Sequence, residues 1–306
     1  MKEQQTEVTD WLSGKFSFSK VHTAFGCMRK FFYRYVMKMK DAASPWFVVG
    51  QAVHTGQEAD NNAKLEGKGL TLKQTLDAAV SKLEEARAEG GWKPKDIPTD
   101  PFVAEHTAQL EAYKRSGEWD KVYPAPGSVE APFEIIAKVG DPEHGLEPAV
   151  IEGFVDVVSV DEEGNRKVID YKTAGRPTKQ SEADGHIQLA LEAIGAQAAA
   201  GQITTFVKTG KQKPTTKVTE PTPSTEERGK LALKHMADGI HAIRRAVKTG
   251  DFPKCDPAAY YCQHGRGCEF GRLCFNTSDL KEFIQVEKLR PVGSLETPEW
   301  RKTKKT

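Results

Sequence analysis

Two aspartates and a lysine lie in a pair of β-branched segments near the middle of the chain. Asp156 lies in IEGFVDVVSV, Asp170 and Lys172 lie in RKVIDYKT, and the turn-forming residues DEEGN separate the two segments. This pattern predicts a β-hairpin in which Asp170 and Lys172, two residues apart, share one face of their strand. Two carboxylates that converge on one face ionise together only at a cost unless a cation joins them. Oxygen ligands favour a hard ion, Mg²⁺ or Mn²⁺, and Lys172 can stabilise charge on a nearby phosphate.

The acid–x–base triplet carries little information by itself. With 43 acids and 44 bases among 306 residues, about six such triplets arise by chance, and the alternative interpretation is a solvated strand face. The context favours a site, because G-F-V-D precedes the triplet and a helix carrying Gln188 follows it. Glu130 and Glu134 come before the hairpin. They could support the metal ligands from behind, but we interpret them as ordinary strand-surface acids.

Cysteines form the second chemical signal. Four of the five lie in the C-terminal segment FPKCDPAAYYCQHGRGCEFGRLC and the fifth, Cys27, lies near the start of the chain. The C-x6-C-x5-C-x5-C spacing lacks the paired C-x2-C knuckles of common zinc sites. Four thiolates suit zinc or an iron–sulfur cluster. The spacing leaves open a local site made of the four C-terminal cysteines and a site that combines Cys27 with three of them.

The composition bounds the class of protein. The formal net charge is +1, 38% of the residues are hydrophobic and 28% are charged, which is typical of a globular protein. The apolar runs are too short to span a bilayer and the N-terminus lacks a secretory signal, so we expect a cytoplasmic protein without membrane contact. Two segments, 27–40 and 207–217, are locally basic and are candidate DNA-binding segments. Their candidate residues are Arg29, Lys30, Arg34, Lys208 and Lys211.

The elements that position these residues follow from periodicity. We expect helices over 17–40, 45–60, much of 61–120, 183–199 and EERGKLALKHMADGIHAIRRAVKTG, and strands over 128–139, the hairpin and 203–209. The aromatic residues of 31–35 are interpreted as core packing, and KPTTKVTEPTPST as a loop. The order of helices and strands predicts an α/β fold built around a small mixed sheet.

These motifs together resemble the PD-(D/E)XK nuclease superfamily, and within it the RecB-like exonucleases that include CRISPR-adaptation and phage enzymes. The motifs follow the family's order from SFSKVHTAFGCMRKFFY through GQAVH, GFVD and IDYK. The resemblance implies a restriction-endonuclease-like core, a mixed central sheet flanked by helices, with a helical insertion and a cysteine-rich C-terminal segment. The implied boundaries are one nuclease domain over 1–290, with the insertion at 61–127, the catalytic sheet and helix at 128–209, the cluster segment at 250–278 and a tail at 291–306.

The resemblance also implies roles for single residues. A lone histidine is more often structural, but the G-x-x-x-H motif makes His54 a metal ligand together with Asp156, Asp170 and the carbonyl of Tyr171. The implied catalytic residues are Asp156, Asp170, Lys172 and Gln188. Glu192 occupies the place where the family usually has tyrosine. The implied [4Fe–4S] ligands, with zinc as the alternative, are Cys27, Cys262, Cys268 and Cys274, which leaves Cys255 unassigned.

The predicted function is a metal-dependent DNA nuclease, an exonuclease of recombination, repair or DNA processing that works with a recombination or helicase protein. Three alternatives remain open from the sequence: a nuclease-fold DNA-binding protein with little cleavage, a zinc-stapled interaction module, and an RNA-directed nuclease of the same fold.

Overall fold

The computed structural model describes residues 14–39, 45–89, 96–141, 145–210, 213–255, 262, 268–270 and 274. The chain divides into two units, Met1–Pro253 and Lys254–Thr306. All helices and strands named below belong to the first unit. Within the described ranges, no helix has both the length and the hydropathy needed to cross a bilayer.

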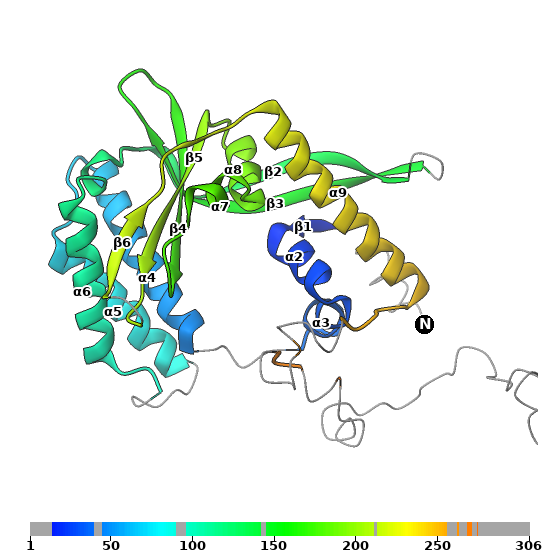
Figure 1. Cartoon of the computed structure of the whole chain (residues 1–306), viewed down its shortest axis with the longest axis horizontal. Coiled ribbons are helices and arrows are strands. Elements are labelled where there is room, and N and C mark those ends of the chain that lie inside the picture. Colours follow the sequence, from blue (N-terminus) through cyan, green and yellow to red (C-terminus); the bar gives the residue numbers. More distant parts are fainter. Residues whose placement is uncertain are drawn as a thin grey trace, which may run out of the picture. The chain divides into compact units, whose positions relative to one another are not determined.

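A mixed sheet of seven strands forms the centre of the first unit (Figure 1). The long β3 pairs with β2 along one edge and with β1 and β4 along the other, and β5 continues the sheet to β6 and β7. The β1–β3 and β4–β5 pairs are parallel and the others antiparallel. The strands are β1 (Lys15–Ser17), β2 (Pro124–Asp141), β3 (Gly145–Val160), β4 (Arg166–Ala174), β5 (Ala200–Val207), β6 (Thr215–Val218) and β7 (Thr222–Pro223).

Helices cover both faces of this sheet, and Figure 1 shows α4, α5 and α6 gathered apart from α2, α8 and α9. One core lies between the first group and the side chains of Val157, Ile169, Tyr171 and Phe206. The helices are α2 (Phe18–Gly26), α3 (Met28–Phe31), α4 (Pro45–Leu65), α5 (Leu72–Glu89), α6 (Thr99–Arg115), α7 (Gln180–Asp184), α8 (Ile187–Gly195) and α9 (Glu226–Thr249), with a π-helical turn at Phe32–Val36 and a 3₁₀ turn at Trp119–Lys121.

The predicted α/β architecture, a mixed sheet flanked by helices, is confirmed. The prediction of one continuous helix over 17–40 is wrong, because Cys27 has an extended backbone (φ −165°) that separates α2 from α3. Its sulfur accepts a hydrogen bond from the backbone N–H of Lys30 and caps α3. The aromatic residues of this region pack in the core as predicted, Phe31 being fully buried. The segment predicted as a Pro/Thr loop contains the short strands β6 and β7.

The regular alternation of side chains between the two faces of the sheet is interrupted at one position along the paired strands β2 and β3. Val129 and Val157, paired across the strands, pack in the core under α4–α6. Ala131 and Val155, also paired, pack in the core under α8 on the opposite face. Residues two apart on a regular strand share a face, so both strands change face between these pairs. Glu130 and Asp156 occupy the positions of the change.

Candidate active site

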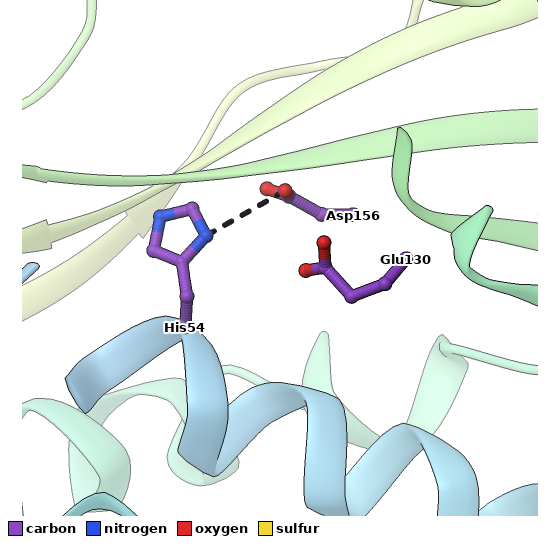
Figure 2. A group of neighbouring side chains, drawn as sticks. All are labelled: His54, Glu130 and Asp156. Atoms are coloured by element: carbon purple, nitrogen blue, oxygen red, sulfur yellow. Dashed lines mark ion pairs between the residues drawn. The ribbon is translucent and has the colours of Figure 1, made fainter. Parts of the chain in front are cut away.

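Asp156 and His54 meet between β3 and α4. Asp156 Oδ1 lies 3.5 Å from His54 Nδ1, and Asp156 Oδ2 accepts a 2.6 Å hydrogen bond from the backbone N–H of Tyr171 on β4. Figure 2 shows the imidazole turned toward the Asp156 carboxylate, with Glu130 of β2 beside it. Burial lowers the pKa of His54, but the Asp156 carboxylate outweighs it and raises the pKa overall. The histidine therefore pairs with a carboxylate at the surface of the sheet.

Three potential ligand atoms come together at this point. One atom each from His54, Glu130 and Asp156 lie within 4.8 Å of one another, and all three residues are half-buried. Burial, followed by the Asp156 charge, raises the pKa of Glu130 to about 7. The like charges of Glu130 and Asp156 therefore repel each other, and a divalent cation would relieve that repulsion.

Asp170 lies on the neighbouring strand and is buried. Its Oδ1 pairs with Lys172 Nζ at 2.8 Å, so the predicted placement of these two side chains on one face is correct. Its Oδ2 is buried without a hydrogen-bond partner among the described residues. Burial raises the pKa of Asp170 to about 6, with Lys172 opposing and Asp156 adding to the shift. An unpartnered carboxylate oxygen beside further carboxylates fits a bound cation, and the donor set of oxygens with one imidazole suits Mn²⁺ or Mg²⁺.

A chain of hydrogen bonds extends from Asp170 to α8. Lys172 Nζ donates to Gln188 Oε1 at 3.3 Å, and Gln188 Nε2 donates to Glu192 Oε1 at 2.7 Å. Because the amide nitrogen of Gln188 is held by Glu192, its carbonyl oxygen faces the ammonium group. Burial raises the pKa of Glu192 well above its usual range, and the Asp170 charge adds to this. Glu192 thus fixes the orientation of Gln188, which helps to fix Lys172.

A model of the PD-(D/E)XK nuclease superfamily matches residues 15–275. The chain belongs to the PD-(D/E)XK nuclease superfamily. No curated protein matches it.

Among solved structures, a "Putative exonuclease" from Eubacterium rectale is 14% identical to this nuclease-superfamily chain, with a TM-score of 0.52. That match covers 87% of this chain and 92% of the other, and it supports the restriction-endonuclease-like fold. A crystal structure of SSO0001 is 12% identical over 89% of this chain and 93% of that one, with a TM-score of 0.38.

Membership in the PD-(D/E)XK superfamily supports nuclease activity, a DNA substrate and the use of a divalent metal. The residues predicted from the motifs lie together: His54, Asp156, Asp170, Lys172 and Gln188 come from α4, β3, β4 and α8. The side chain of Tyr171 points away from Asp170 into the core, where its hydroxyl accepts a hydrogen bond from Asn61.

Two acids of this site were not among the residues predicted to form it. The interpretation of Glu130 as a surface acid is wrong, because its carboxylate joins His54 and Asp156. Glu134 is exposed and paired with Lys15, as interpreted. Glu192 is only 3% exposed, although its identity alone predicts a solvated residue. Its position four residues after Gln188 on a helix was the signal that could have placed it beside that amide.

The candidate DNA-binding residues and the candidate cluster ligands belong to other segments of the chain than the acidic site. The Arg29 guanidinium lies 5.9 Å from the centre of the Phe32 ring, in a region that packs with α9 rather than with α4. Lys208 is half-buried at the end of β5, and Lys211 lies outside the described residues. In the second unit, Cys262 and Cys274 are buried and Cys268 is half-buried. Cys255 Sγ lies 2.7 Å from Cys262 Sγ.

Proposed function

We propose that the chain is a Mg²⁺- or Mn²⁺-dependent deoxyribonuclease of the RecB-like branch, and that it acts as an exonuclease in recombination, repair or DNA processing. The observation that carries this proposal is the convergence of His54, Asp156 and the buried Asp170–Lys172 pair at one place on the sheet. When bound, the metal ion supplies charge stabilisation and acidifies water for attack on a phosphodiester.

The side chains have separate parts in this reaction. His54, Asp156, Asp170 and the carbonyl of Tyr171 would hold the metal. Asp156 is oriented by the N–H of Tyr171, so its second oxygen is directed toward His54. Lys172, held between Asp170 and Gln188, keeps its positive charge because Asp170 raises its pKa against the effect of burial. Its ammonium group would orient the attacking water and stabilise the negative charge that develops on the phosphate.

The experiment is a Mn²⁺-dependent cleavage assay on single- and double-stranded DNA labelled at the 5′ or the 3′ end. Wild type should release short labelled products, and Asp170→Ala should reduce cleavage at least about 10³-fold, because the variant loses a metal ligand and the partner of Lys172. Glu162→Ala, an exposed acid in the turn after β3, is the matched control and should cleave like wild type. Full activity of Asp170→Ala, at unchanged circular dichroism, would contradict the assignment.

The products also test the finer parts of the proposal. Mononucleotides from one labelled end indicate an exonuclease with that polarity, whereas internal fragments indicate an endonuclease. DNA binding without cleavage by wild type would favour the alternative of a nuclease-fold recombination partner.

We propose in addition that Cys27, Cys262, Cys268 and Cys274 hold a [4Fe–4S] cluster that joins the beginning and the end of the domain. The supporting observation lies within the first unit. The backbone N–H of Arg29 donates to Pro253 O at 3.0 Å, and the Phe32 and Phe252 rings lie 4.6 Å apart. The chain therefore leaves this unit beside the helix that follows Cys27. A cluster that linked Cys27 to the C-terminal cysteines would close a very long loop and would strongly restrict the unfolded chain.

Purified protein distinguishes the cluster from zinc. A cluster predicts brown protein that absorbs near ~400 nm and contains iron and acid-labile sulfide, whereas zinc predicts colourless protein. Cys27→Ser should lose the absorbance. Cys255→Ser should keep the absorbance. If Cys255→Ser loses the absorbance and Cys262→Ser keeps it, Cys255 would replace Cys262 in the ligand set.

A further inference from the structure

Glu130 has a backbone conformation that its residue type disfavours. Its φ is +47°, in the left-handed region, where a side chain with a Cβ is strained. The residue lies within β2, between Val129 and Ala131, whose partners on β3 are Val157 and Val155. Glu130 is therefore opposite Asp156, at the position where both strands change face.

This arrangement has two unfavourable features. The backbone is strained, and two carboxylates lie opposite each other on paired strands, where like charges destabilise a sheet. An irregularity in a strand can redirect a side chain toward a site. Here the irregularity turns Glu130 toward His54 and Asp156, so that one ligand atom from each falls within 4.8 Å of the others (Figure 2).

We propose that Glu130 is a further carboxylate ligand of the divalent cation, and that its left-handed backbone directs the side chain toward that cation. This inference rests on the proposed metal-dependent nuclease function and extends its ligand set beyond the residues of the sequence motifs. With Glu130, two carboxylates and an imidazole face the cation on the side of α4 and β2. An imidazole nitrogen in the set favours Mn²⁺ over Mg²⁺, which prefers oxygen ligands alone.

Calorimetric titration of the metal-free full-length protein with Mn²⁺ tests this inference without depending on activity. Glu130→Gln keeps the size and the backbone strain but loses the charge, so we expect Mn²⁺ affinity to fall about 10- to 100-fold. The matched control is Glu134→Gln, four residues further along β2, where the side chain is exposed and pairs with Lys15. Its Mn²⁺ affinity should stay within about two-fold of wild type, because Glu134 lies outside the group of potential ligands and its exposed ion pair contributes little to the fold.

The melting temperature of the metal-free protein separates a ligand from a structural residue. Glu130→Gln removes the repulsion from Asp156, and Glu130→Gly in addition accepts a positive φ without strain, so neither should melt below wild type although both bind Mn²⁺ weakly. A ligand role is contradicted if Glu130→Gln binds Mn²⁺ like wild type, if Glu134→Gln loses affinity equally, or if both Glu130 variants melt lower without metal.

Parallel cleavage assays keep this inference distinct from the proposed function. Wild type that binds Mn²⁺ through Glu130 but leaves DNA intact would overturn the nuclease assignment and support the ligand. Wild type that binds no Mn²⁺ would overturn the ligand assignment.

Discussion

The two sides of the acidic site differ in what holds their side chains in place. On the side of α4 and β2, His54, Glu130 and Asp156 bring two negative charges together across paired strands. On the side of β4 and α8, hydrogen bonds link Asp170 through Lys172 and Gln188 to Glu192. A cation would balance the charges of the first arrangement, whereas the hydrogen bonds of the second hold Lys172 and Gln188 and leave Asp170 Oδ2 without a partner among the described residues. If the proposed function is right, the first side would bind the metal, the second would position Lys172, and Asp170 would take part in both.

On the side of β4 and α8, Lys172→Met is the substitution expected to lower kcat most. Methionine preserves much of the length of the side chain but removes the charge that would stabilise the phosphate, so kcat should fall about 10³-fold while Mn²⁺ affinity changes little. Single-turnover cleavage measures the chemical step. A Lys172→Met variant with kcat near wild type would contradict a role in catalysis for the side of β4 and α8.

Glu192 should have a smaller effect on the same step. Glu192→Leu removes the acceptor that orients the Gln188 amide, and we expect kcat to fall about 10- to 100-fold with KM nearly unchanged. Glu192→Gln can still offer a carbonyl oxygen to Gln188 Nε2, so it should recover most of the activity. Equal losses in the Leu and Gln variants would show that the carboxyl group acts in some other way than by orienting Gln188.

The pH dependence of stability tests the burial of Asp170 without a substrate. Burial raises the pKa of Asp170 to about 6 from 3.8, so the folded metal-free protein holds a proton that the unfolded chain has released. Its stability therefore falls as pH rises from about 4 to 6, by an amount on the order of 3 kcal/mol for this group. Melting temperatures of metal-free wild type should show this fall. Asp170→Asn, which cannot ionise, should melt with a flatter profile, and an unchanged slope in that variant would assign the effect to other groups.

Much of this site could be predicted from the sequence, and the failures have physical causes. The two β-branched runs and the turn residues between them predicted the hairpin, and a strand's period of two placed Asp170 and Lys172 on one face. Glu130 was missed because its face depends on one left-handed residue, and alternation assumes that none occurs. The break at Cys27 was missed because the apolar periodicity of α2 continues into α3, and Gly26, which ends α2, was not taken as a helix stop.

The measurement that tests the account most directly is the Mn²⁺ affinity of His54→Ala and Lys172→Met, determined alongside their cleavage rates. We predict that both variants lose cleavage, that His54→Ala weakens Mn²⁺ binding about 10-fold or more, and that Lys172→Met stays within about three-fold of wild type. Equal weakening of Mn²⁺ binding by both substitutions would contradict the division between the two sides. Undiminished cleavage by either variant would contradict the assignment of these residues to an active site.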